Sequence, residues 1–379
     1  MGAVGKICGC LGLLVVCFVG FLGVCVAGVP GKLGFWEYLD TFPDHKGSFY
    51  SMTKGKPWGF TFHDIPDLTG KTALVTGANT GLGYATALHL ARHGASVTLG
   101  CRSAAKCEAA VGAIKANFSH AQVEVGLMDL GSLASVREFG AAYNQRLGEA
   151  GLDILVLNAG VAGCPYTLST DGIEQQFAVN HVGHFLLTQL LEPALLRSQK
   201  ATVTLVSSAA LFSAKTGVFT TLEAINDAGS YDGMAAYGRS KLANVFFTQE
   251  LAKRMEGKEV YVNAVHPGAV ESEIGRHFAA MVEFLGPTVR AFLYSLIEPL
   301  FYPTELGAIT QLYTATSPEI FAKNIRGKYF HPQAREADLP DHARNPKQQE
   351  DLWRLSEELV AGRGGAGAGA KGKGAKSEL

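Results

Sequence analysis

The chain has 379 residues, of which 47% are hydrophobic and 18% are charged. The hydrophobic fraction excludes disorder for most of the chain. Because the formal net charge is −1 and Lys and Arg do not cluster, the composition also excludes a strongly basic surface for nucleic acid. The length allows two or three domains, or one large α/β domain with extensions.

The first segment, residues 1–31, is apolar. No charge occurs between Lys6 and Lys32, and Leu11–Val29 has the length of about 20 residues that crosses a bilayer as a helix. A cleaved signal peptide is the alternative, because the small residues of Val24–Ala27 suit cleavage. Both interpretations direct the chain to the secretory membrane system, and the length of the apolar run favours a retained anchor.

The last segment, residues 362–379, is rich in Gly, Ala and Lys and is predicted to be a flexible tail. Its final four residues, Lys376-Ser377-Glu378-Leu379, differ at one position from the Lys-Asp-Glu-Leu retrieval signal. Together with the N-terminal segment, this ending predicts a membrane protein of the endoplasmic reticulum whose main domain faces the lumen. A membrane protein that faces the cytosol is the alternative.

Between these ends, a linker at 32–66 precedes residues 67–343, in which short apolar runs alternate with helical stretches. This alternation predicts a Rossmann-type, doubly wound parallel sheet in a single α/β domain. A C-terminal helix is predicted at 344–361, since Asn345-Pro346 suits its N-cap and first position. The predicted strands are Thr72–Thr76, Ser96–Gly100, Val123–Leu127, Ile154–Leu157, Val203–Val206 and Val260–Val265.

A glycine-rich turn, Gly77–Gly83, follows the first predicted strand and leads into a predicted helix at Tyr84–Arg92. Glycines let the backbone turn sharply and approach a diphosphate, which then lies at the N-terminus of the following helix. Because it follows the first strand of a βαβ unit, the turn predicts a dinucleotide-binding loop. An ordinary glycine-rich turn is the alternative.

The end of the second strand bears on which dinucleotide binds. An acidic residue is expected there for NAD, but Cys101-Arg102 occupies the position. The planar guanidinium of Arg102 suits a 2′-phosphate. The sequence therefore favours NADP(H) over NAD(H) as the cofactor.

Tyr237 and Lys241 lie one helical turn apart in a long predicted helix that continues through Leu251. A free tyrosine has a pKa of about 10 and is a poor base at neutral pH, whereas a nearby cation favours the phenolate. Such a pair often occurs by chance, so its significance depends on the motifs around it.

Five motifs occur in chain order: Thr76–Gly83, Asn158-Ala159-Gly160, Ser207-Ser208, Tyr237 with Lys241, and His266-Pro267-Gly268. In this order they resemble the short-chain dehydrogenase/reductase superfamily over nearly all of residues 57–360. Within it, Val179–Phe185 and Ser240–Asn244 look most like the retinol dehydrogenase group and the oxidoreductase domain of the WW-domain-containing relatives.

The resemblance implies a catalytic set. Tyr237 would exchange a proton with a carbonyl–alcohol pair, Lys241 would lower the pKa of the tyrosine and bind the nicotinamide ribose, and Ser208 would hold the substrate oxygen. Asn180 would hold a water that extends the proton relay from the lysine.

The predicted cofactor contacts follow from the loop, from Arg102 and from the resemblance. Asp129 would contact the adenine; the alternative is that it is the N-cap of a predicted helix at Gly131–Tyr143. Ser272 stands near the place of a threonine that is usual after the Pro-Gly motif. The predicted contacts are Gly77, Asn79, Thr80, Gly81, Leu82, Gly83, Arg102, Asp129, Leu130, Asn158, Ala159, Gly160, Tyr237, Lys241, Pro267, Gly268, Val270 and Ser272.

The region Glu271–Pro303 is long and apolar, and in the family it closes over the substrate. An apolar lid favours a lipophilic small molecule, such as a retinoid, a steroid or a long-chain aldehyde or ketone. Contact of this region with the membrane, or packing between subunits of a homodimer, is the alternative.

Two other functions remain open. The chain could bind NADP as a scaffold or redox sensor without catalysis, or it could be a light-dependent protochlorophyllide-type reductase, which shares the fold and the Tyr/Lys pair. No Cys/His spacing of a metal site occurs, and Cys101, Cys107 and Cys164 are interpreted as core or surface residues rather than a disulfide framework. His181 and His184 are interpreted as structural.

Overall fold

The structure is a computed structural model whose described residues are 59–214, 219–268, 270 and 303–362. The predicted membrane segment at 1–31, most of the linker, the region 271–302 and the tail from residue 363 lie outside the described residues. Among the helices that are described, none combines the length and the apolar character needed to cross a membrane.

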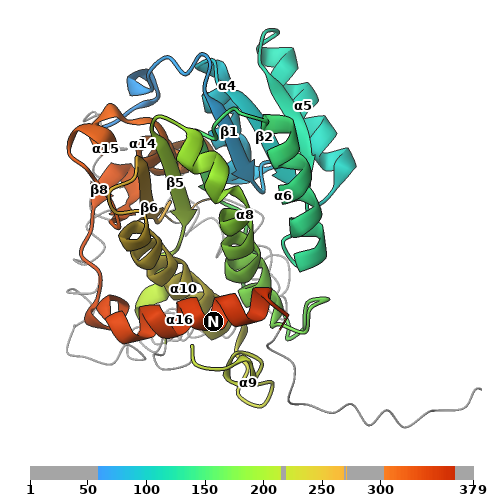
Figure 1. Ribbon diagram of the computed structural model, residues 1–379, viewed down its shortest axis with the longest axis vertical. Coiled ribbons are helices and arrows are strands. Elements are labelled where there is room, and N and C mark those ends of the chain that lie inside the picture. The colour runs from blue at the N-terminus through green and yellow to red at the C-terminus, as the bar shows by residue number, and fades with distance from the viewer. Residues whose placement is uncertain (1–58, 215–218, 269, 271–302, 363–379) are drawn as a thin grey trace, which may run out of the picture. The chain divides into compact units, whose positions relative to one another are not determined.

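The described strands form one sheet in the order β3-β2-β1-β4-β5-β6-β7-β8. Neighbouring strands from β3 to β7 are parallel, and β8 pairs antiparallel with β7 (Figure 1). The predicted parallel sheet is confirmed, while β7 and β8 were not foreseen. The strands are β1 (Thr72–Thr76), β2 (Ser96–Cys101), β3 (Val123–Leu127), β4 (Ile154–Leu157), β5 (Ala201–Val206), β6 (Val260–Val265), β7 (Tyr329–His331) and β8 (Arg335–Glu336).

Helices cover both faces of this sheet. Short helical turns η1 (Phe62–Asp64), η7 (Pro332–Ala334) and η8 (Asp341–Arg344) accompany them. The described helices are α4 (Gly81–Arg92), α5 (Ala104–Asn117), α6 (Leu133–Leu147), α7 (Gln175–Phe177), the π-helical turn η2 (Ala178–Val182), α8 (Gly183–Arg197), η3 (Ala209–Ser213), α9 (Leu222–Ile225), α10 (Gly233–Arg254), α13 (Thr304–Gly307), α14 (Ile309–Thr316), α15 (Pro318–Ala322) and α16 (Pro346–Val360).

Two hydrophobic cores lie on opposite faces of the sheet. In β1, Leu74 joins the core formed with α6, α8, α10 and α16, whereas Ala73 and Val75 join the core formed with α4, α5 and α14. Successive side chains of a strand point to opposite faces, so a strand that is buried on both sides has a continuous apolar sequence. This is why short apolar runs located the central strands.

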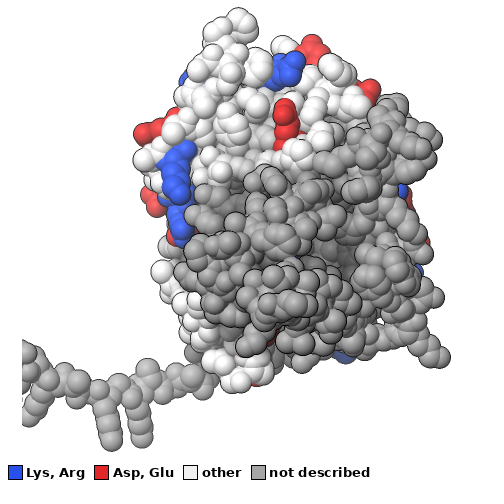
Figure 2. Space-filling model, turned by 180° about the vertical axis from the view of Figure 1, so that it is seen from behind, with Lys and Arg blue, Asp and Glu red and all other residues white. Residues whose placement is uncertain are grey.

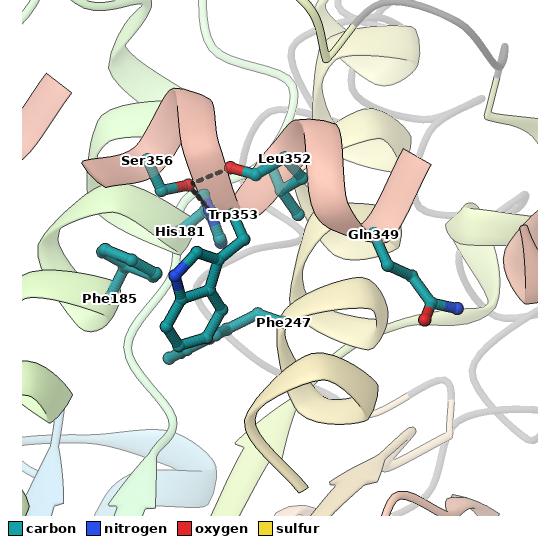
Figure 3. A pocket seen from close by; sticks show the side chains of 7 residues that line it. All are labelled: His181, Phe185, Phe247, Gln349, Leu352, Trp353 and Ser356. Carbon is teal, nitrogen blue, oxygen red and sulfur yellow. Dashed lines mark hydrogen bonds between the residues drawn. The ribbon is translucent and has the colours of Figure 1, made fainter. Parts of the chain in front are cut away.

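The C-terminal helix α16 confirms the predicted helix start. The Asn345 side chain accepts a hydrogen bond from the Gln348 amide, and Pro346 occupies the first turn. Figure 3 shows Trp353 of α16 between Phe185 of α8 and Phe247 of α10, with ring centroids 5.0 Å and 5.9 Å away. Helix α16 therefore packs onto α8, which directly follows the turn with Asn180, and onto α10, which carries Tyr237.

Where described residues are visible in Figure 2, around the margin and the upper part of this face, both basic and acidic side chains occur. Exposed ion pairs such as Arg146–Glu124 and Lys328–Glu336 join the two signs directly. This mixed surface matches the near-neutral composition of the chain.

The carboxyl ends of the parallel strands all reach one edge of the sheet. The register pairs Thr76 of β1 with Gly100 of β2, and Leu157 of β4 with Leu205 of β5. Loops that leave this edge are the usual place for a ligand in an open α/β sheet. The predicted site residues come from these loops and from the helices that follow them.

Candidate active site

The glycine-rich loop has the geometry of a phosphate cradle. Gly77 and Gly81 have positive φ angles of 66° and 60°. A Cβ at Gly83 would lie 2.4 Å from the Gly77 carbonyl oxygen, whereas a Cβ at Gly81 would meet nothing within 4 Å. Space beside Gly81 is therefore open to a ligand, while Gly83 lets the helix close onto the loop.

The N-terminus of α4 is available for an anion. Thr80 is the N-cap residue, but its side chain makes no capping hydrogen bond, and no acidic residue lies in the first turn. Unpaired amides and the positive end of the helix dipole at this place suit a diphosphate. The predicted loop contacts Gly77, Asn79, Thr80, Gly81, Leu82 and Gly83 all belong to this cradle.

The cradle is fixed to its neighbouring strands. The Gly77 amide donates to the Gly100 carbonyl oxygen at 2.7 Å, and the Asn158 side-chain amide donates to the Thr76 carbonyl oxygen at 2.9 Å. A Cβ at Gly160 would lie 3.3 Å from Lys241 Nζ. The loop after β4, with Asn158, Ala159 and Gly160, thus lies between the cradle and the predicted catalytic lysine.

Arg102 follows β2 directly and is exposed, next to the cradle. Cys101 and Cys107 on either side of it are buried, as an interpretation as core residues expects, but they form a disulfide, so the prediction that these cysteines make no disulfide was wrong. The end of β2 and the first turns of α5 bring their Cα atoms to 6.0 Å, which suits a disulfide. The disulfide closes the turn that carries Arg102.

Asp129 and Leu130 follow β3 on the same edge. The Asp129 carboxylate accepts from the Gly131 amide at 2.9 Å, but the side chain that caps α6 is Ser132, which accepts from the Ser135 amide. The alternative of Asp129 as this N-cap was therefore wrong, and the helix begins at Leu133 instead of Gly131. Asp129 stays a predicted adenine contact.

The predicted catalytic side chains converge. Tyr237 and Lys241 lie on α10, with Lys241 Nζ 5.6 Å from the centre of the Tyr237 ring, and the Ser208 side chain hydrogen-bonds the Tyr237 phenol. Lys241 Nζ donates to the Val206 carbonyl oxygen at 2.9 Å. The end of β5 thus holds both the serine and the lysine beside the tyrosine.

Burial perturbs both titrating groups of this set. It raises the pKa of Tyr237, against which the hydrogen bond from Ser208 acts, and it lowers the pKa of Lys241 to about 8. Each shift disfavours the charged form, because both side chains are removed from water. With a pKa of about 8, the lysine is still mostly protonated at neutral pH and loses its proton above pH 8.

Asn180 lies in the π-helical turn η2, fully buried. Its Oδ1 accepts from the Val161 amide at 2.8 Å, and its Nδ2 donates to the Val161 carbonyl oxygen and to Ser240 Oγ. Ser240 Oγ donates in turn to the Tyr237 carbonyl oxygen at 2.7 Å. The side chain of Asn180 is thus used in structural contacts, and its role in holding a water stays a prediction.

The last predicted cofactor contacts follow β6. Gly268 has a φ of 93°, and Val270 lies close to Leu82, since a Cβ at Gly307 would meet side-chain atoms of both at 2.6 Å and 2.8 Å. Pro267 and Gly268 are described with this turn, whereas the predicted contact Ser272 lies outside the described residues.

Sequence reasoning missed two contributors to this arrangement. Thr76 and His184 hydrogen-bond each other beneath the site at 2.9 Å, and both are fully buried. His184 is interpreted as structural from the sequence because no metal-ligand partner is evident for it. The only available signal was its place one turn after Asn180.

Comparisons with known proteins agree with this geometry. A profile of the short chain dehydrogenase family matches residues 71–283. Human retinol dehydrogenase 14 is 40% identical over 305 residues, which cover 77% of this chain and 86% of that protein. The WW domain-containing oxidoreductase of Pongo abelii is 38% identical over 314 residues, which cover 79% of this chain and 70% of that protein.

A solved structure gives the same result for the fold. The crystal structure of an uncharacterized protein from Mycobacterium paratuberculosis has a TM-score of 0.61 and 32% identity, and covers 80% of this chain and 98% of that chain. The chain belongs to the short-chain dehydrogenase family.

Proposed function

We propose that the protein is an NADP(H)-dependent oxidoreductase that interconverts an alcohol and a carbonyl on a lipophilic substrate. The observation that carries the proposal is the convergence of Ser208, Tyr237 and Lys241 beside the cradle of α4. A non-catalytic scaffold would need the cradle alone. The intact cluster therefore favours an enzyme.

The residues present fit a nicotinamide dinucleotide. The open space at Gly81 and the N-terminus of α4, which has no side-chain cap, suit its diphosphate. Arg102 would bind a 2′-phosphate, and Asp129 and Leu130 would contact the adenine. Asn158–Gly160 and Lys241 would lie along the cofactor between its diphosphate and its nicotinamide. When bound, the cofactor supplies or accepts the hydride.

In the proposed mechanism, Tyr237 handles the proton. For carbonyl reduction its phenol donates a proton to the substrate oxygen as the carbonyl carbon receives hydride, and for alcohol oxidation the phenolate takes that proton back. Ser208, which already hydrogen-bonds the phenol, holds the same oxygen. Lys241, in its protonated form, stabilises the phenolate.

The proposed substrate class depends on the apolar sequence at 271–303 and on the names of the similar proteins. The apolar region at 271–303 favours a lipophilic molecule, and the similar retinol dehydrogenases are named for one. A retinoid, a steroid and a long-chain aldehyde or ketone all have this character. The exposed apolar side chains of Leu168, before α7, and of Met234, in the first turn of α10, add to the apolar surface.

We propose an endoplasmic reticulum membrane location with the main domain in the lumen. The apolar segment at 1–31 and the ending Lys376–Leu379 support it. The Cys101–Cys107 disulfide adds support, since disulfides persist in oxidising compartments. Digestion of a C-terminal epitope by protease in sealed microsomes without detergent would place the domain on the cytosolic side instead.

The test of the mechanism is Tyr237→Phe in the purified full chain. We expect NADPH binding, followed by fluorescence, to persist, while turnover falls roughly 100-fold or more, since proton transfer is lost. Tyr143→Phe is the matched control, because Tyr143 is equally buried but lies in α6. Wild-type-like turnover of Tyr237→Phe would refute the mechanism.

A substrate screen completes this test. Retinal, a steroid ketone and a long-chain aldehyde, each with NADPH and with NADH, are compared in the dark and in the light. Turnover in the dark separates the proposed activity from that of a light-dependent reductase. If none of these compounds is turned over, the result favours the alternative in which the chain binds NADP without catalysis.

A further inference from the structure

His184 is a buried polar side chain to which the proposed mechanism gives no task. It lies in the first turn of α8, one turn after Asn180, with 1% of its surface exposed. Its Nδ1 lies 3.1 Å from the Asn180 carbonyl oxygen and its Nε2 lies 2.9 Å from Thr76 Oγ1. The imidazole thus joins the end of β1 to the turn that carries Asn180.

The hydrogen bonds around Thr76 determine where the protons are. Thr76 Oγ1 accepts from the Asn158 amide at 2.9 Å and from the Ala159 amide at 3.0 Å. A hydroxyl oxygen has two acceptor positions, so Thr76 must donate its own proton. Its nearest acceptor is His184 Nε2, since the Val156 carbonyl oxygen lies farther away, at 3.4 Å.

The other end of the imidazole leads to the same tautomer. The Asn180 carbonyl oxygen can only accept, so His184 Nδ1 must carry a hydrogen, while Nε2 accepts from Thr76. The neutral form is required, because a second proton on Nε2 would face the hydroxyl proton. Burial and the nearby charge of Lys241 on α10 lower the pKa of His184 to about 3, in agreement.

We propose that His184, as the neutral Nδ1–H tautomer, is a positioning residue that holds the Asn180 carbonyl and the loop Asn158–Ala159 in one geometry. This inference rests on the proposed function and on the role predicted for Asn180 from the sequence, which is to hold a water that extends the proton relay from Lys241. The hydrogen bond from Nδ1 fixes the direction of this carbonyl group and therefore the geometry of the turn from which Asn180 would hold the water.

The location of this network explains why it matters. A π-helical turn departs from the regular backbone hydrogen bonding of a helix, and such turns occur frequently at functional sites. In η2 the Asn180 side chain is held by Val161 and Ser240, and His184 holds its carbonyl. The whole residue is therefore fixed, as precise alignment of a proton relay requires.

Two substitutions separate the two ends of the imidazole. His184→Asn keeps a donor at the position of Nδ1 but has nothing at the position of Nε2. His184→Gln reaches the position of Nε2 but offers no donor at the position of Nδ1. If the proposal is right, His184→Gln lowers kcat roughly tenfold to a hundredfold while NADPH binding stays within a few-fold of wild type. His184→Asn keeps kcat within a few-fold of wild type but weakens NADPH binding, because the loop Asn158–Ala159 loses its contact through Thr76.

His181 provides the matched control. It lies in the preceding π-helical turn η2, is also buried and has its pKa lowered to about 3 by burial, but its Nε2 contacts Ser356 Oγ of α16 at 2.8 Å (Figure 3). We expect His181→Asn and His181→Gln to lower the melting temperature without any difference in kcat between them. Equal kcat losses for Asn and Gln at position 184 would overturn the proposal.

A spectroscopic readout keeps the inference testable apart from activity. In ¹⁵N-histidine-labelled wild-type protein, with the signal assigned by its loss in His184→Gln, we expect the Nδ1–H tautomer without titration between pH 5 and 8. An Nε2–H tautomer, or titration near the ordinary pKa of about 6.5, would overturn the inference. If the wild type shows no turnover, the proposed function is refuted. The spectrum then still tests whether His184 is the neutral Nδ1–H tautomer that joins Thr76 to Asn180.

Discussion

Cofactor choice is predicted to depend on Arg102, which lies exposed at the end of β2 beside the cradle. Replacement by Ala removes charge-assisted hydrogen bonds to a 2′-phosphate, and hydrogen bonds to charged groups contribute about 1.5–3 kcal/mol each. Because the guanidinium is exposed and screened by solvent, we take the lower end of this range. NADPH binding should therefore weaken roughly tenfold, while NADH binding changes little, because NADH has no 2′-phosphate.

The assay is a fluorescence titration of each cofactor on the same preparation. Arg102→Lys keeps the charge but loses the planar pair of donors, so it should recover only part of the NADPH affinity. Lys106→Ala is the control for general electrostatics, since Lys106 is an exposed basic residue in the first turn of α5. Added salt should weaken wild-type NADPH binding more than binding by Arg102→Ala.

Equal losses of NADPH and NADH affinity in Arg102→Ala would refute this reasoning. Such a result would show that the side chain supports the loop rather than the 2′-phosphate. A loss in Lys106→Ala as large as that in Arg102→Ala would likewise assign the effect to the general charge of the α5 N-terminus.

Three further predictions follow from single contacts. Cys107→Ser, which removes the disulfide, should lower the free energy of unfolding by about 2 kcal/mol in urea denaturation, from the entropy of a loop this short; an unchanged stability, or the absence of a Cys101–Cys107 cross-link in peptide mapping, contradicts it. Gly83→Ala should abolish measurable NADPH binding in the fluorescence titration, because its Cβ would lie 2.4 Å from the Gly77 carbonyl oxygen; near-normal affinity would show that the loop can shift. Burial lowers the pKa of Lys241 from 10.5 to about 8, so between these values the unfolded chain binds a proton that the folded chain has released. The free energy of unfolding of the cofactor-free protein should therefore rise by roughly 2 kcal/mol from pH 8 to 10, and Lys241→Met should remove this rise; an equal rise in the variant would assign it to other groups.

The central strands could be predicted because they are buried on both faces and have continuous apolar sequences. Strand β7 could not, since Tyr329–His331 is too short to form a recognisable run. Its place in the sheet depends on long-range hydrogen bonds, such as that from the His266 amide to the Phe330 carbonyl oxygen at 2.7 Å. Such pairing is set by tertiary contacts that a local pattern does not contain.

Helix starts were predictable only in part. Asn345 precedes a proline and caps α16 as expected, because no competing cap residue stands nearby. Before α6, however, both Asp129 and Ser132 are good N-cap residues, and the backbone chooses Ser132. Asp129 instead closes a tight turn on Gly131. Composition alone does not distinguish these two uses of the same kind of side chain.

The disulfide was missed for a geometric reason. Cys101 and Cys107 are six residues apart, a spacing that carries no signal by itself. It becomes a cross-link because β2 ends at Cys101 and α5 starts three residues later, so the helix folds its first turns back over the strand end. The sequence analysis located the strand, but neither the bounds of α5 nor the angle at which it follows β2.

The glycines of the motifs show how tightly the site is assembled. A Cβ at Gly183 would lie 2.4 Å from the Leu130 carbonyl oxygen, and one at Gly160 would lie 3.2 Å from Asn180 Oδ1. The first contact brings α8 against the end of β3, and the second brings the loop after β4 against η2. Close approach of these backbones is what lets one imidazole, that of His184, reach both the end of β1 and the Asn180 carbonyl. Residues without chemistry of their own therefore set the geometry in which Tyr237 and Lys241 are proposed to act.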